Sequence, residues 1–250
     1  MSNHTYLKLC TQVYDLSKPT PPDEAYAFYR SYVKAASGPI LEPMCGSGRF
    51  LLPLLKEGFD VHGFDASPDM LHALHQKADT QKLKINVWEG LIQDLKRSER
   101  YALMFIPTGS FGLIIEHDQI KRSLKVLFEH LKENGILLFE VETLKAVPTP
   151  TGVWRCSVWN LSNEQMILAN YCSSVSDDIC TAIGRYELVA HNKIIETEIE
   201  EYKIRLYSDE TVLTKVLHEI GFRHVRVVKA FDRNNCPDTE DEVLIYECIK

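Results

Sequence analysis

The residues best suited to chemistry by type and spacing lie between residues 40 and 50, in the segment Ile-Leu-Glu-Pro-Met-Cys-Gly-Ser-Gly-Arg-Phe. Glu42 ends a short apolar run, Gly46 and Gly48 follow it, and Asp65 ends the next apolar run. Paired glycines let the backbone turn tightly and approach a ligand, beside the N–H groups that open a helix. An acid that ends the second strand of a doubly wound sheet reaches ribose hydroxyls. We therefore expect both carboxylates to face one nucleoside.

The spacing of the glycines favours a nucleoside without a diphosphate. A dinucleotide-binding fingerprint places its third glycine at position 51, and this chain has Leu51 there. Glu42 attracts an ammonium group, which a diphosphate site does not need. A cofactor with one ribose and an amino-acid end therefore fits better than a nicotinamide dinucleotide, which stays an alternative.

The elements that position these acids alternate between strand and helix. Expected strands span 39–42, 59–64, 84–88, 101–106, 136–142, 223–230 and 242–248, and expected helices span 21–36, 47–57, 68–78, 118–132 and 209–220. Ser67 is the expected N-cap before Pro68 at the first helical position. This order predicts an α/β fold, Rossmann-like and doubly wound, with a mostly parallel seven-stranded sheet covered on both faces.

A different pattern interrupts this order after the fifth strand. Pro148-Thr-Pro-Thr-Gly152 ends the alternation, and four β-rich segments follow, divided by the turn signals Ser162–Asn163, Asp177–Asp178 and His191–Asn192. We predict an inserted antiparallel β-meander over 148–207, inside a cofactor-binding domain made of 1–147 and 208–250. The meander is expected near the acceptor side, and a dimer interface is the alternative role.

The motif residues are similar to those of a known family. The sequence resembles the class I S-adenosylmethionine-dependent methyltransferases, whose first motif is an acid, three other residues and then Gly-x-Gly, matched here by Glu42, Gly46 and Gly48, with Asp65 ending strand two. Residues 104–111 resemble the fourth motif of the family, and residues 131–139 resemble its loop into strand five. The chain departs from the family at Ala102, near which an Asp is usual.

The third match concerns adenine. Residues 88–95 lie where the family carries Gly-Asp-Ala-x-x-Leu, and Leu91 replaces the acid. The resemblance then implies that the backbone of Leu91 and Ile92, and not a side chain, receives the adenine amino group.

The resemblance implies an S-adenosylmethionine-dependent methyltransferase acting on a small-molecule acceptor. In the family's Tyr-Asp entry, matched by Tyr14 and Asp15, the tyrosine lies over the methyl-bearing sulfur, where an aromatic face stabilises the cation. Tyr14 and His117 are the candidates to accept a proton. The expected cofactor contacts are Tyr14, Glu42, Met44, Gly46, Ser47, Gly48, Asp65, Ala66, Met70, Gly90, Leu91, Ile92 and Pro107. A protein that binds S-adenosylmethionine without transferring its methyl group is a further alternative.

Other chemically capable residues have simpler interpretations. His72 and His75 lie three apart on a helix, but no further ligand is nearby, so we expect no metal site. Cys45 has no local partner and is interpreted as a small loop residue. Glu140 and Glu142 end strand five and can face the reacting methyl group. Trp154, Trp159 and Arg205 of the insertion are candidates for an acceptor pocket.

Composition narrows the function classes. The chain has 250 residues, and its 35 Asp and Glu exceed its 28 Lys and Arg, for a net charge of −7. Without basic runs a nucleic-acid binder is not expected, because phosphate contacts supply most of that affinity. The seven cysteines include no Cys-x-x-Cys pair and are predicted to be reduced and mostly buried. No apolar run approaches the roughly 20 residues of a membrane span, and no secretory signal is visible, so a cytoplasmic location is expected.

Overall fold

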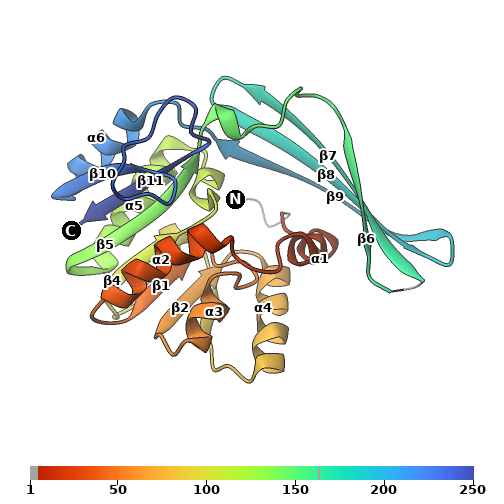
Figure 1. Cartoon of the computed structure of the whole chain (residues 1–250), viewed down its shortest axis with the longest axis horizontal. Coiled ribbons are helices and arrows are strands. Elements are labelled where there is room, and N and C mark those ends of the chain that lie inside the picture. Colours follow the sequence, from red (N-terminus) through yellow and green to blue (C-terminus); the bar gives the residue numbers. More distant parts are fainter. Residues whose placement is uncertain (1–4, 163) are drawn as a thin grey trace.

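The computed structural model describes residues 5–162 and 164–250, which contain a main seven-stranded sheet (Figure 1). The strand order is β10-β11-β5-β4-β1-β2-β3. Strands β1 to β5 pair in parallel, and β11 is antiparallel to both β5 and β10. The bounds are β1 (Ile40–Pro43), β2 (Val61–Asp65), β3 (Asn86–Glu89), β4 (Tyr101–Ile106), β5 (Leu131–Glu142), β10 (His224–Lys229) and β11 (Val243–Ile249). The predicted Rossmann-like, mostly parallel sheet is confirmed.

Helices cover both faces of this sheet because successive strand residues point to opposite sides. In β4, Leu103 and Phe105 join a core with α2 (Asp23–Ala35), α3 (Leu51–Lys56) and α4 (Pro68–Gln81). Met104 and Ile106 join a second core with α5 (His117–His130) and α6 (Glu210–Ile220). Short 3-10 turns η1 (Ile92–Asp94), η2 (Ser110–Leu113) and η3 (Leu144–Ala146) complete the connections.

The two predicted boundaries that differ most from the structure do so for identifiable reasons. The helix expected over 47–57 begins only at Leu51, because Gly46 and Gly48 have φ of +52° and +81°, which are not helical. The strand expected over 136–142 begins at Leu131, since α5 ends at His130 and the chain re-pairs with β4 across a register shift. The predicted cap is confirmed: the Ser67 hydroxyl accepts a hydrogen bond from the Met70 backbone N–H at 3.2 Å.

The predicted meander forms a second sheet, in the order β6-β7-β8-β9 with every pair antiparallel. It follows β5 and precedes α6, and its strands extend outwards from the main sheet (Figure 1). The turn between β8 and β9 has both residues at positive φ, His191 at 50° and Asn192 at 59°, as a tight hairpin requires. The strands are β6 (Arg155–Asn160), β7 (Gln165–Ser176), β8 (Ile179–Ala190) and β9 (Lys193–Arg205).

A helix that the sequence did not predict, α1 (Lys8–Ser17), lies between the second sheet and α4 (Figure 1). One face of α1 is apolar and packs on β7 and β8, so α1 joins the second sheet to the main domain. The buried residues of this contact are Leu9, Cys10, Val13, Ile167, Ala169 and Tyr186.

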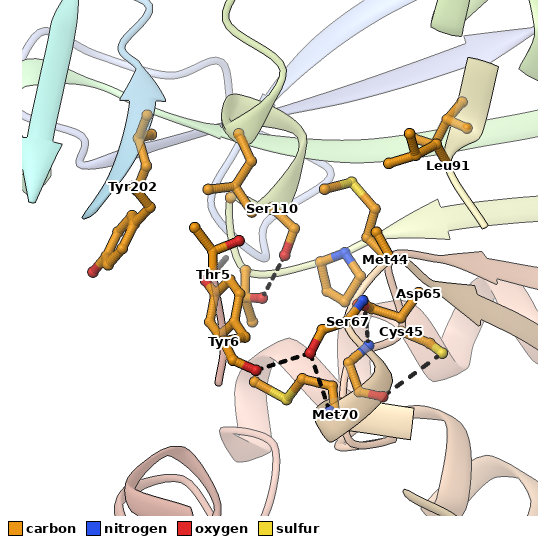
Figure 2. Close-up of a pocket in the computed structure, with 18 of the residues that line it drawn as sticks. Thr5, Tyr6, Met44, Cys45, Asp65, Ser67, Met70, Leu91, Ser110 and Tyr202 are labelled. Carbon is orange, nitrogen blue, oxygen red and sulfur yellow. Dashed lines mark hydrogen bonds between the residues drawn. The ribbon is translucent and has the colours of Figure 1, made fainter. Parts of the chain in front are cut away.

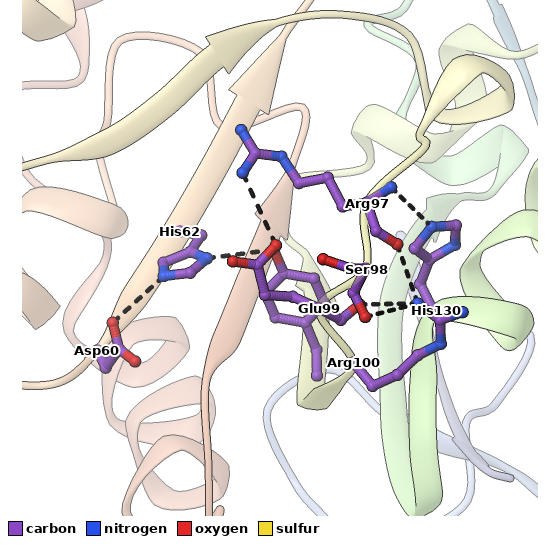
Figure 3. Close-up of polar contacts among 8 residues, drawn as sticks. Asp60, His62, Arg97, Ser98, Glu99, Arg100 and His130 are labelled. Atoms are coloured by element: carbon purple, nitrogen blue, oxygen red, sulfur yellow. Dashed lines mark hydrogen bonds and ion pairs between the residues drawn. The ribbon is translucent and has the colours of Figure 1, made fainter.

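A polar cluster fixes the connection into β4 at the amino-terminal edge of the main sheet (Figure 3). The Arg100 guanidinium donates to the backbone carbonyls of Arg97, Ser98 and Glu99 at 3.0 to 3.1 Å. His62 contacts the Tyr101 hydroxyl at 3.1 Å and Asp60 at 3.4 Å. These contacts hold β2 and β4 together at the edge opposite to their carboxyl ends. Within the described residues, no helix combines the length and the apolarity that crossing a bilayer requires.

Candidate active site

A cavity of about 490 Å³ opens at the carboxyl ends of β1, β2 and β4 and is closed by α1 and β9 (Figure 2). Such a volume is typical of small-ligand sites. The structure brings most of the predicted site residues together here. Those that line the cavity are Tyr14, Glu42, Met44, Gly46, Asp65, Ala66, Met70, Gly90, Leu91, Ile92 and Pro107.

Glu42, at the end of β1, is a buried acid with an unsatisfied oxygen. Its residue is only 2% exposed, and its Oε2 atom has no hydrogen-bond partner among the described residues. Burial raises the pKa of Glu42, the nearby Asp65 carboxylate raises it further, and the Leu51 backbone N–H partly offsets both. A buried carboxylate of this kind is stabilised by a ligand that brings a positive charge or a hydrogen-bond donor.

Asp65, at the end of β2, holds the glycine loop against the start of α4. Its Oδ2 accepts from the Gly46 backbone N–H and its Oδ1 from the Ser67 backbone N–H, both at 2.8 Å. Burial raises the pKa of Asp65, and the backbone N–H groups of Ser67, Gly46 and Ala66 lower it. Each oxygen retains a second lone pair, so the carboxylate can still accept from a ligand hydroxyl.

Gly48, Ser47 and His117 do not line this cavity. A Cβ on Gly48 would lie 3.0 Å from the side chains of Leu52 and Leu74, so this glycine faces α3 and α4. The Ser47 hydroxyl donates to Asp15 at 2.5 Å. His117 is exposed at the start of α5, while its neighbour Glu116 lines the cavity.

Sequence reasoning missed the wall formed by segments from opposite ends of the chain. The Tyr6 ring lies 6.1 Å from Tyr202 of β9 in a stacked arrangement and 6.4 Å from Tyr14 edge-on. The Ser67 hydroxyl donates to the Tyr6 carbonyl at 2.9 Å, which ties this segment to the α4 cap. No local pattern marks Tyr6 or Tyr202, because only the tertiary fold brings them together. The other lining residues not predicted as cofactor contacts include Thr5, Lys18, Cys45, Arg49, Phe50, Thr108, Gly109, Ser110, Gln119, Glu142, Glu201, Lys203 and Ile204.

The end of β5 contributes two glutamates with different surroundings. Glu142 lines the cavity, and burial raises its pKa while the Lys18 ammonium lowers it. Glu140 is not in the lining. It accepts from the Tyr29 hydroxyl at 2.6 Å, and burial raises its pKa to about 7 despite hydrogen bonds from Tyr29 and from the backbone of Thr108 and Gly109. Thr108 and Gly109 have φ of 60° and 69°, so Glu140 supports a left-handed turn at the cavity wall.

The candidates from the insertion lie outside the cavity lining, whereas Cys45 is part of it. Trp154 is exposed, Trp159 packs with the α1 cluster, and Arg205 pairs with Asp178 and donates to the Ile115 carbonyl at 2.9 Å. Cys45 lines the cavity, but burial raises the pKa of its thiol, which disfavours the nucleophilic thiolate. Across residues 5–162 and 164–250, no group of three or more His, Cys, Asp or Glu side chains is arranged to hold a metal ion.

Comparisons with known proteins show which proteins the chain is similar to. A family model described as a methyltransferase domain matches residues 40–135. A protein of Geobacillus sp. (strain WCH70) named as a methyltransferase is 30% identical over 114 residues, and the match spans 46% of this chain and 46% of that relative.

Two solved structures share the fold over almost the whole chain. An S-adenosylmethionine-dependent methyltransferase from Clostridium acetobutylicum ATCC 824 superposes with a TM-score of 0.77 at 20% identity, over 95% of this chain and 96% of that chain. The sugar N-methyltransferase KedS8 from Streptoalloteichus sp ATCC 53650 has a TM-score of 0.76 at 14% identity, over 94% and 91%. The chain is therefore similar to S-adenosylmethionine-dependent methyltransferases: residues 40–135 match the methyltransferase domain, and almost the whole chain shares the fold of the two solved structures.

Proposed function

We propose that this protein transfers the methyl group of S-adenosylmethionine to a small-molecule acceptor. The observation that carries the proposal is the pair of strand-end acids in the lining of one cavity, Glu42 with an unsatisfied buried oxygen and Asp65 beside the glycine loop. The match of residues 40–135 to a methyltransferase domain supports methyl transfer over the nicotinamide chemistry that the sequence left open.

The residues at the main-sheet end of the cavity suit the parts of the cofactor. Glu42 would hold its ammonium group, and Asp65 would accept from the ribose hydroxyls. Leu91 and Ile92 would flank the adenine, with Met70 close to the loop. An ammonium group at Glu42 would satisfy a buried oxygen that is otherwise unsatisfied, which is why the residues present fit this cofactor.

When bound, S-adenosylmethionine supplies an already activated methyl group, so this chain's residues mainly orient the acceptor and exclude water. Fixing the reacting groups in line contributes about 7 to 11 kcal/mol in favourable systems. Tyr14, Tyr6 and Tyr202 line the same cavity and provide aromatic faces for a cation.

Glu142 is the residue we propose to receive a proton or to bind a positively charged acceptor. It lines the cavity, and a carboxylate whose pKa is raised by burial is a better base than an ordinary one. His117 lies outside the lining. Burial raises the pKa of the Tyr14 hydroxyl, which suits that residue to donate a hydrogen bond and disfavours its use as a base.

The acceptor class is supported by the enclosure of the cavity. The N-terminal segment and β9 cover it, and a nucleic-acid duplex would need an open, basic surface, which the net charge of −7 does not favour. KedS8, by its name, methylates a nitrogen of a sugar, and three glutamates in this lining, Glu116, Glu142 and Glu201, suit an amine acceptor. The role of the second sheet as a roof, or in a homodimer, stays a prediction.

Binding and turnover test the proposal separately. Calorimetry with S-adenosylmethionine should show binding to the wild-type protein and a loss of about tenfold to a hundredfold in Asp65→Asn, because an amide supplies one acceptor oxygen where the carboxylate supplies two. Asp60→Asn, at the opposite end of β2, is the matched control and should bind normally. A panel of amino and hydroxyl sugars with mass-spectrometric detection then tests transfer. Binding without any turnover would favour a sensor, and binding of a nicotinamide dinucleotide alone would contradict the proposal.

A further inference from the structure

Helix α1 is attached at its two ends to different parts of the molecule. At its start, Glu198 of β9 accepts from the Leu9 backbone N–H at 2.7 Å, and Glu200 accepts from the Leu7 N–H at 3.4 Å. These two carboxylates satisfy N–H groups that no side chain of the helix caps. The first turn of α1 is therefore fixed to the second sheet.

Near its end, α1 is fixed to the glycine loop through Asp15. One carboxylate oxygen of Asp15, Oδ1, accepts from the Ser47 hydroxyl at 2.5 Å and from the Lys77 ammonium of α4 at 2.8 Å. Ser47 is 1% exposed, and a hydrogen bond to a charged group is stronger than a bond between neutral groups.

The bond connects two walls of the cavity. Ser47 lies between Gly46, whose N–H donates to Asp65, and Gly48, which packs on α3 and α4. Asp15 directly follows Tyr14, another residue of the cavity lining. A short path of bonded residues thus runs from the carboxylate proposed to bind ribose to the ring that faces the acceptor.

We propose that Asp15 is a positioning residue that couples the glycine loop to α1, so that cofactor binding stabilises the docked position of residues 5–18 and fixes Tyr14 and Tyr6 at the acceptor side. The inference rests on the proposed function. A ligand that contacts the loop in its ordered form favours every contact which that form makes, and the docked helix is one of them.

Cys10 provides a reporter for the docking of α1. It is 6% exposed between α1 and the second sheet, and burial, together with the Glu200 carboxylate, raises the pKa of its thiol. Iodoacetamide can therefore reach it only when α1 leaves the sheet. Cys156, exposed on β6, is the internal reference for the intrinsic rate of alkylation by the reagent. Cys248, buried in β11, is the reference for global unfolding.

The experiment follows alkylation of each cysteine by peptide mass spectrometry, with and without saturating S-adenosylmethionine. In the wild-type protein the cofactor should slow alkylation of Cys10 by about tenfold relative to Cys156. In Asp15→Ala, at cofactor concentrations that calorimetry shows to be saturating, this protection should fall to less than about twofold, and kcat should fall more than KM for the acceptor rises.

Three variants make the result specific. Lys8→Met changes a residue of the same helix, α1, and removes its exposed ion pair with Glu196 of β9. This variant should keep the full protection of Cys10 by the cofactor. Ser47→Ala removes the donor of the Ser47–Asp15 hydrogen bond and should reproduce the loss of Cys10 protection. This variant therefore tests the coupling even where Asp15→Ala folds poorly. The double variant should be no worse than Asp15→Ala, because both changes remove one interaction.

Each outcome decides the proposal. The coupling would be overturned if the cofactor protected Cys10 equally in the wild-type protein and in Asp15→Ala. It would also be overturned if the cofactor bound but did not protect Cys10 in either protein. Both results would leave the proposed function intact. No binding of S-adenosylmethionine to the wild-type protein would overturn the proposed function and the coupling with it.

Discussion

Glu42 and Asp65 place two carboxyl groups at neighbouring strand ends, and burial raises the pKa of both. Their charged forms are therefore costly in the ligand-free protein. A site that is strained before binding and relieved by a cationic ligand gains affinity from that relief.

This argument predicts opposite effects for one substitution. Glu42→Gln should raise the free energy of unfolding of the ligand-free protein above pH 7, because it removes a buried charge, and should weaken S-adenosylmethionine binding by about tenfold to a hundredfold. Urea unfolding and calorimetry measure the two effects. Glu89→Gln, at the exposed end of β3, is the control and should change neither. Undiminished affinity in Glu42→Gln would remove this residue from the site.

Glu140 should make stability depend on pH. Its pKa in the folded protein is about 7, against about 4.5 when exposed, so the folded state binds the extra proton between these values. The free energy of unfolding should therefore decrease as pH rises from about 4.5 to 7, by roughly 3 kcal/mol from this group. In Glu140→Gln that contribution should be absent. Urea unfolding at pH 5 and pH 8 compares the two proteins, and identical pH slopes would contradict the assignment.

Gly48 is expected to matter for packing more than for ligand contact. A Cβ there would meet Leu52 and Leu74 at 3.0 Å, while Gly58, also at positive φ, has nothing within 4 Å. Gly48→Ala should therefore destabilise the fold by about 1 to 3 kcal/mol more than Gly58→Ala. Thermal unfolding of both variants measures the difference in stability. Equal destabilisation would show that the cost comes from backbone strain alone and not from packing against Leu52 and Leu74.

At the level of helices and strands, the main sheet could be predicted because each of its signals is local. Gly58 marks the end of α3, and Ser67 and Pro68 mark the start of α4, so the sequence itself indicates these boundaries. The acids at the strand ends can be identified once the alternation of strands and helices is known. The cofactor half of the site could therefore be predicted from the sequence. Boundaries failed where glycine φ angles, as at Gly46, decided the start of a helix.

Helix α1 could not be predicted for a physical reason. Its cap is Glu198, 189 residues away from Leu9, and its apolar face is satisfied by strands that also come late in the chain. A ten-residue helix without a local cap is marginal by itself. The acceptor half of the site could not be predicted for the same reason, since Tyr6 and Tyr202 come together only when α1 packs on the second sheet.

The cavity spans both sheets of the molecule, so ligand protection should extend across both. Hydrogen exchange with S-adenosylmethionine should slow in residues 5–18 as well as in 42–49, 65–70 and 90–92, because the same cavity includes residues of each segment. Addition of an acceptor should extend the protection to 201–204 of β9. Protection confined to the main sheet would show that α1 and β9 do not enclose the ligands.

The dependence of α1 on β9 also sets an order of events during translation. At about 5 to 20 residues per second, the ribosome needs roughly 10 to 40 s to pass from Leu9 to Glu198, 189 positions later. For most of that interval the nascent chain carries an amphipathic segment, with Leu9, Cys10 and Val13, whose apolar partners in β7 and β8 have not yet been made. Strands β1 to β5 emerge well before β9, so the wall that completes the cavity is added after them. A transcript cut short before codon 165 yields a polypeptide whose first helix lacks both its apolar partners and its cap, and that exposed apolar face is a site for aggregation.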